Sequence, residues 1–184
     1  MRIEQLKKTY DISVKWVHFP LHPDTPPDGR TLEELFAGRG MDVAAAQAEM
    51  RKRMQSEGLA YGSRSHTYNS RLAQELGAWA DTQPGGEAVH DALYQAYFVD
   101  ARNIGDVEVL LEIATSVGLD AEEARRVLEE RRFKDAVDAD WQKSASYGVT
   151  GVPTFVAGGY GVVGAQPYEM LEDLVSRAGA QRRS

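Results

Sequence analysis

The sequence contains no cysteine. A chain without cysteine forms no disulfide, binds no metal through thiolates and has no thiol nucleophile of its own. It also has no apolar run near the roughly 18 residues that a membrane helix requires. Residues 1–8 are charged and amphipathic and do not contain the apolar stretch of a secretion signal. We therefore expect a protein that crosses no membrane and resides in the cytoplasm.

Basic residues are fewer than acidic residues. The chain has 21 Lys and Arg against 28 Asp and Glu, a formal net charge of −7. Two short basic runs, 51–53 and 131–132, lie among acidic residues with helical periodicity, which is typical of a solvated helix face. Nucleic acid is therefore an unsuitable partner, because binding phosphates requires a concentrated basic surface. The remaining composition, 42% hydrophobic and 27% charged, is that of an ordinary globular domain with a core.

The polar residues form no catalytic constellation. Ser63, Ser65 and His66 are close in sequence, but serine catalysis needs a base and oxyanion donors arranged in space, so we interpret this stretch as a solvated loop. The histidines are scattered without carboxylates at metal-ligand spacing, and no metal site is predicted. We expect His18 to pack on a strand, and we interpret Asp138 and Asp140 as surface charges on a helix.

Local patterns divide the chain into a strand, a long helical block and a β-β-α tail. Residues 2–9 have helical spacing, residues 11–19 are rich in β-branched and aromatic side chains, and five of the next ten positions are proline or glycine. From 31 to 146 we expect helix throughout, with starts at residues that cap helices: Thr31, Asp42, Ser70, Asp106 and Asp120.

The period changes after Gly148. Residues 149–157 read as a strand that contains Pro153, Gly158-Gly159 as a hairpin turn, and 160–164 as the returning strand. Pro167 suits the first position of a final helix.

Residues 148–156, Gly-Val-Thr-Gly-Val-Pro-Thr-Phe-Val, resemble the cis-proline strand of thioredoxin-fold proteins. Further segments resemble the FrnE subgroup of the DsbA family, and together they cover nearly the whole chain in order: Asn69–Ala73, Ala96–Phe98, Asn103–Asp106, Gly118–Asp120 and Gly164–Pro167. Where relatives often have histidine after the first of these segments, this chain has Gln74.

The resemblance implies an α/β, thioredoxin-like fold with a large all-helical insertion. Residues 1–30 and 147–184 would form the thioredoxin-like core, and residues 31–146 the insertion. The family's first central strand and its Cys-x-x-Cys motif are missing from the sequence, so we expect Met1 to be a downstream start or a truncation point. The resemblance assigns substrate contacts to Val152 and Pro153 and suggests one for Gln166, for which a helix-capping role is the alternative.

Three functions stay open. The first is a DsbA/FrnE-like thiol–disulfide oxidoreductase, inactive as written because its redox cysteines are absent. The second is a glutathione-dependent isomerase of the same fold, with glutathione as co-substrate. The third is a non-catalytic thioredoxin-fold binding module. The expected partner is a protein or small molecule that bears a thiol or disulfide, and a homodimer could cover the sheet edges that the absent strand leaves unpaired.

Overall fold

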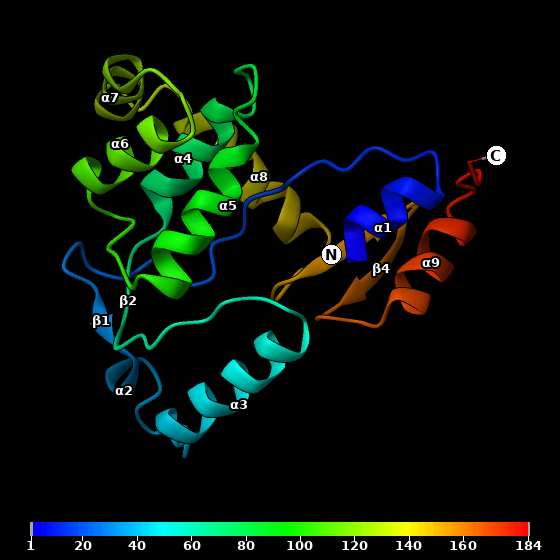
Figure 1. Ribbon diagram of the computed structural model, residues 1–184, viewed down its shortest axis with the longest axis horizontal. Helices are drawn as coiled ribbons and strands as arrows, with labels where there is room; N and C mark the ends of the chain where they lie inside the picture. Colours follow the sequence, from blue (N-terminus) through cyan, green and yellow to red (C-terminus); the bar gives the residue numbers. More distant parts are fainter. Residues whose placement is uncertain (1, 184) are drawn as a thin grey trace. The chain divides into compact units, whose positions relative to one another are not determined.

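The computed structural model describes residues 2–183, which form two compact clusters (Figure 1). The terminal unit contains the described residues up to Leu21 and those from Asp140 onward, and the helical unit contains His22–Ala139. The sequence placed these boundaries at 30/31 and 146/147. In this described part of the chain, no helix is both long and apolar enough to span a membrane.

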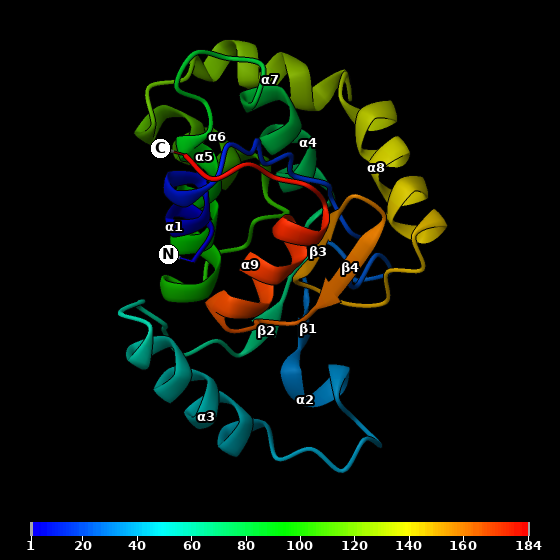
Figure 2. The same ribbon diagram turned by 90° about the vertical axis from the view of Figure 1, so that its right-hand side faces the viewer.

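The helical unit is built around α4, α5, α6 and α7, which lie together in Figures 1 and 2. Its elements are β1 (Arg30–Thr31), α2 (Leu32–Leu35), α3 (Val43–Ser56), β2 (His66–Thr67), α4 (Arg71–Ala80), α5 (Ala88–Tyr94), the π-helix η1 (Gln95–Val99), α6 (Val107–Ser116), α7 (Ala121–Glu129) and the first part of α8 (Lys134–Ser146). Leu76, Val89 and Leu110 are fully buried at its centre. Each of these helices carries apolar residues at helical spacing, and the buried faces that result pack against one another.

Most predicted helix starts are confirmed by the capping bonds themselves. Thr31 and Glu34 form a reciprocal capping box at α2. Asp42, Asp106 and Asp120 each accept a hydrogen bond from a backbone N–H in the first turn of the helix that follows. Ser70 precedes α4 without such a bond. These caps satisfy amides that a helix cannot pair internally.

The expectation of helix throughout 31–146 is wrong. β1 and β2 pair antiparallel, with Arg30 opposite Thr67, and the chain between α3 and β2 is extended. Gly62 in that segment donates its N–H to the carbonyl of Phe98, and a Cβ on Gly62 would lie 2.0 Å from the carbonyl oxygen of Val99. The helix propensity of a segment does not reveal such a close approach to another part of the chain. Here the approach holds the segment before β2 in an extended conformation against η1.

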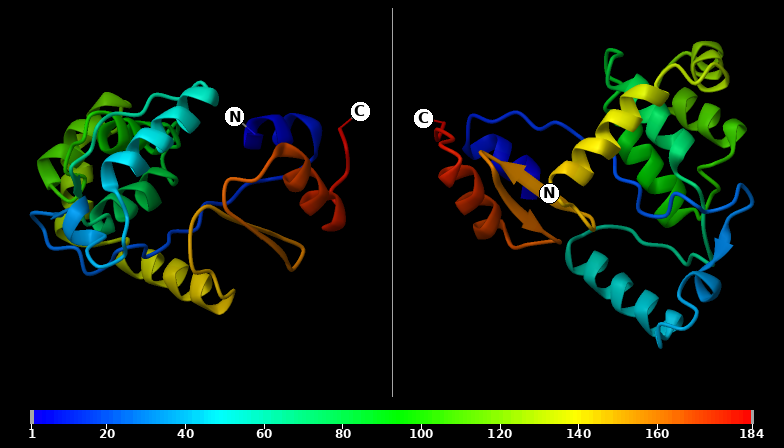
Figure 3. Two further views of the ribbon diagram at one scale, coloured as in Figure 1. Left: turned by 90° about the horizontal axis from the view of Figure 1, so that it is seen from below. Right: turned by 180° about the vertical axis from the view of Figure 1, so that it is seen from behind.

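The terminal unit consists of α1 (Arg2–Thr9), the end of α8, the hairpin of β3 (Thr154–Ala157) and β4 (Tyr160–Val163), and α9 (Tyr168–Arg177). Figures 2 and 3 show α1 and α9 beside the hairpin. Leu6, Tyr10, Leu171 and Val175 form its buried cluster. The hydroxyl of Tyr10 bonds Glu172 and Ser176, so the end of α1 is tied to α9. The predicted hairpin and last helix are confirmed.

The strand predicted for residues 11–19 does not form. The segment is irregular, and the nearest pairing is an isolated bridge between Tyr10 and Arg182. Val14 is 41% exposed and Trp16 58% exposed. A β-rich pattern becomes a strand only when a neighbouring strand completes its hydrogen-bond ladder, and no described strand lies alongside this one.

Candidate functional site

Val152 and Pro153 lie immediately before β3. The peptide bond between them is cis, and the Val152 side chain is 52% exposed. The carbonyl of Pro153 accepts a hydrogen bond of 2.7 Å from the N–H of Gly164, which follows β4. This bond extends the pairing of the hairpin by one step and fixes the position of the two residues at its open end.

The backbone of Val152 is available to a ligand. Within residues 2–183, neither its N–H nor its carbonyl makes a hydrogen bond to another residue. Unpaired backbone groups beside the end of a strand are the groups that an extended peptide uses when it adds to a sheet. Val152 therefore offers a donor and an acceptor that nothing in the described chain satisfies.

Gln166 lies at the same end of the hairpin as Pro153. Its side-chain Nε2 donates a 2.7 Å hydrogen bond to the carbonyl of Val163, and a Cβ placed on Gly164 would meet that nitrogen at 3.6 Å. Gln166 thus fastens the connection from β4 to α9. Pro167 occupies the N-cap position of α9 and makes no side-chain capping bond, so Gln166 is not the capping residue.

Sequence reasoning missed a His–Asp pair in the terminal unit. Nδ1 of His18 lies 2.9 Å from Oδ2 of Asp140, and the backbone N–H of His18 donates to the same oxygen at 3.1 Å. Ser144 donates its hydroxyl to the carbonyl of His18. The side chains of His18 and Asp140 are mostly buried, with exposed fractions of 15% and 18%. A carboxylate that holds one imidazole nitrogen orients the ring and leaves the other nitrogen for proton transfer.

The interpretation of Asp138 and Asp140 as plain surface charges is therefore corrected. Asp140 pairs with His18, and Asp138 forms ion pairs of 2.7 Å with Arg71 and with Lys134. The hydrogen bonds from Lys134 and Arg71 lower the pKa of Asp138. His18 and Asp140 are 122 residues apart, so no local pattern could reveal their contact.

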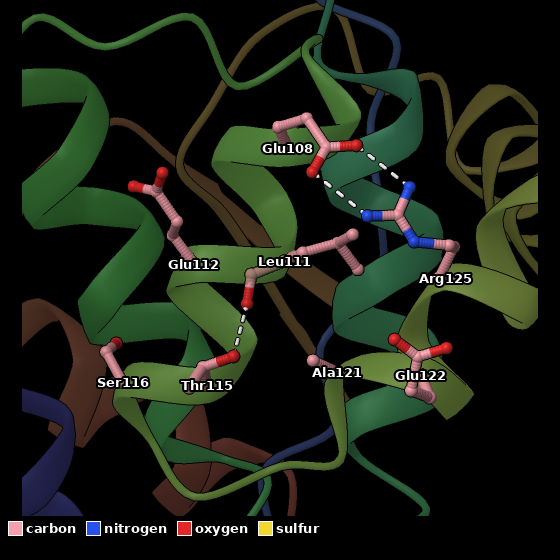
Figure 4. A pocket seen from close by; sticks show the side chains of 8 residues that line it. All are labelled: Glu108, Leu111, Glu112, Thr115, Ser116, Ala121, Glu122 and Arg125. Carbon is pink, nitrogen blue, oxygen red and sulfur yellow. Dashed lines mark hydrogen bonds and ion pairs between the residues drawn. The ribbon is translucent and has the colours of Figure 1, made fainter.

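A shallow hollow of about 420 Å³ lies on α6 and α7 in the helical unit (Figure 4). Glu108 and Arg125 form a two-bonded ion pair across it, and these bonds lower the pKa of Glu108 and raise that of Arg125. Thr115, also on α6, donates its hydroxyl to the carbonyl of Leu111. Most polar groups of the hollow are engaged in such bonds, so the hollow presents no convergent set of free groups to a ligand. No metal-binding group of His, Asp and Glu occurs within residues 2–183.

A family model described as the DSBA-like thioredoxin domain matches residues 1–176. The chain belongs to this family. The match covers both compact units, including the β3–β4 hairpin and α9 up to residue 176.

Two further proteins resemble the chain over most of its length. The uncharacterized protein YwbO of Bacillus subtilis (strain 168) is 29% identical over 175 residues, which is 94% of this chain and 86% of that protein. A probable DsbA oxidoreductase from Streptomyces coelicolor is 37% identical, with a TM-score of 0.78, over 86% of this chain and 72% of that chain.

A 2-hydroxychromene-2-carboxylate isomerase has the same fold, with a TM-score of 0.71 over 97% of this chain and 85% of its own, at 17% identity. Solved structures with this fold thus include both an oxidoreductase and an isomerase. The present sequence contains none of the cysteines on which thiol–disulfide exchange depends.

Proposed function

We propose that this protein acts in thiol–disulfide chemistry of the FrnE type, as the part that holds an extended, disulfide- or thiol-bearing substrate. The observation that carries the proposal is the free backbone of Val152 at the open end of the β3–β4 hairpin. The 37% identity to a probable DsbA oxidoreductase supports the same class.

The role of each residue follows from its contacts. Val152 would donate its N–H to the substrate backbone and accept a hydrogen bond on its carbonyl, extending the sheet by one short pairing. Pro153, fixed by Gly164, holds that backbone in place, and Gln166 secures the turn next to it. Exchange of a disulfide begins with attack by a thiolate, and the 184 residues supply none, so the sulfur nucleophile comes from outside this sequence.

The test is a titration of isotope-labelled protein, followed by amide NMR, with two probes. One is an unfolded protein that keeps its disulfides, and the other is oxidised glutathione. We expect the unfolded protein to shift the amides of Val152, Thr154 and Gly164, and Pro153→Ala to weaken binding about tenfold through loss of one well-placed backbone contact. Val163→Ala is the matched control, because Val163 is 59% exposed on the neighbouring strand.

Binding of glutathione but not of the unfolded protein would instead support the function of a glutathione-dependent isomerase. Shifts that avoid Val152 with both probes, or equal weakening by Val163→Ala and Pro153→Ala, would contradict a substrate site here. The purified chain should not accelerate reduction of insulin by dithiothreitol, since it contains no cysteine.

A further inference from the structure

Four arginines in the helical unit differ from the rest. Within residues 2–183 they form no ion pair with a carboxylate: Arg30, Arg39, Arg51 and Arg64. Arg51 is satisfied by the hydroxyl of Ser63. Most of the other arginines pair with Asp or Glu, as expected where carboxylates outnumber cations. Arginines that stay unpaired in an acidic protein need another explanation.

Arg64 is held by aromatic rings. Its Cζ lies 4.4 Å from the ring centroid of Tyr97 and 5.2 Å from that of Phe98. Its Nε is buried without a hydrogen-bond partner, and Nη1 makes only a long bond of 3.4 Å to the carbonyl of His66. The guanidinium is therefore fixed in orientation by stacking while its hydrogen-bonding capacity is largely unused.

The pairing of β1 with β2 brings Arg30 towards Arg64. Arg30 lies opposite Thr67, and Arg64 bonds the carbonyl of His66, the residue before Thr67. The charges on Arg39, Arg30 and Arg64 all lower the pKa of His22, after the larger effect of burial, which agrees with this placement. Arg30 also lowers the pKa of Glu34, but less than the Thr31 hydrogen bonds do, and Glu34 is engaged in the α2 capping box.

Aromatic side chains border Arg64. Tyr61, Tyr94, Tyr97 and Phe98 form a connected set of rings at η1, and all are partly exposed. The close approach of Gly62 to Val99 carries the chain across η1 and delivers Arg64, two residues later, onto the rings. η1 is a π-helix, and such turns are frequent at functional sites.

We propose that Arg64, Arg30 and Arg39 bind the anionic group of a small aromatic ligand, a carboxylate or a phosphate, whose ring lies against the aromatic set of η1. Guanidinium groups recognise both oxyanions through paired N–H donors, and the rings provide apolar area for the rest of the ligand. The site lies wholly within the helical unit and is independent of the role proposed for Val152.

The experiment is calorimetric titration of the full chain with phenyl phosphate, benzoate and inorganic phosphate. We expect saturable binding of at least one aromatic anion with a Kd of about 1 mM or tighter. Arg64→Gln should weaken it about tenfold or more, since a hydrogen bond to a charged group is lost. Arg53→Gln, which removes an exposed arginine paired with Glu49 on α3, is the matched control and should leave the affinity unchanged.

Each result decides the proposal. Tighter binding of phenyl phosphate than of benzoate identifies a phosphate ligand, and the reverse a carboxylate. Equal affinity for inorganic phosphate and phenyl phosphate would mean an adventitious ion only and would overturn it, as would an equal loss in Arg53→Gln or the absence of saturable binding. If circular dichroism finds Arg64→Gln unfolded, Arg39→Gln takes its place, because Arg39 is exposed and its loss should still weaken binding.

Discussion

At the scale of single residues, Glu75 shows how a charge can be buried inside the helical unit. Its side chain is 0% exposed, and it accepts hydrogen bonds of 2.6 and 2.8 Å from Arg131 and one of 2.7 Å from Arg71. Burial alone would raise the pKa of Glu75, but the bonds from Arg131 and Arg71 outweigh it and hold the pKa below its ordinary value.

We therefore expect Glu75→Gln to lower the free energy of unfolding by about 3 kcal/mol, because Arg131 and Arg71 lose charged hydrogen bonds to a fully buried carboxylate, while Arg71 keeps its ion pair with Asp138. Glu49→Gln breaks an exposed pair with Arg53 and should cost less than about 1 kcal/mol. Urea unfolding at pH 7 compares them. The stabilisation by Glu75 is present above the unfolded pKa of about 4.3 and is lost as pH falls through the lower folded pKa. Equal costs for the two variants would refute this account.

His22 provides a second residue-scale prediction. Burial lowers its pKa most, followed by the charges of Arg39, Arg30 and Arg64. The unfolded chain therefore binds a proton at a higher pH than the folded chain does, and His22 makes stability fall as pH drops below about 6.5. Arg39→Gln should raise the pKa of His22 in an NMR titration of the imidazole, whereas Arg53→Gln should not. An unchanged pKa in Arg39→Gln would show that the charge of Arg39 does not act on His22.

At the scale of elements, Gly62 determines how the segment before β2 meets η1. A Cβ there would lie 2.0 Å from the carbonyl oxygen of Val99, so we expect Gly62→Ala to destabilise the protein by about 1–3 kcal/mol, the usual cost of overpacking. A Cβ on Gly151 would meet no atom within 4 Å, and its φ is not positive, so Gly151→Ala is a matched control with little effect. Thermal unfolding compares the two, and an equally mild Gly62→Ala would mean that the segment shifts freely.

The elements also separate what the sequence could predict from what it could not. The capping roles of Asp106 and Asp120 could be predicted because each residue caps the helix that begins at the next position. The resemblance singled out Val152, Pro153 and Gln166, and the structure brings Pro153 and Gln166 to one end of the hairpin, while their role in binding stays a prediction. Contacts between distant segments left no local trace, as with His18 and Asp140 or Arg64 and Tyr97. The strand predicted for residues 11–19 was wrong for the same reason, because strand formation depends on a neighbouring strand and not only on composition.

At the scale of the whole molecule, the two units have unequal buried cores. The cluster of the helical unit spans α4 to α7 with many fully buried side chains, whereas that of the terminal unit rests on Leu6, Tyr10, Leu171 and Val175. Because the free energy of local opening follows the apolar contacts that are lost, the terminal unit should open first. The amides of α1 and α9 should then lose protection from hydrogen exchange at lower urea concentrations than those of α4 and α6.

Two substitutions test whether the two units open independently of each other. Leu6 is 3% exposed and Leu110 is 0% exposed, and truncation of a buried leucine to alanine costs about 2–5 kcal/mol. Leu6→Ala should reduce amide protection in α1 and α9 while leaving α4 and α6 as they were. Leu110→Ala should reduce protection in α4 and α6. If either variant lowered protection equally in all four helices, the chain would unfold as a single cooperative body, and the smaller core would owe its stability to the larger one.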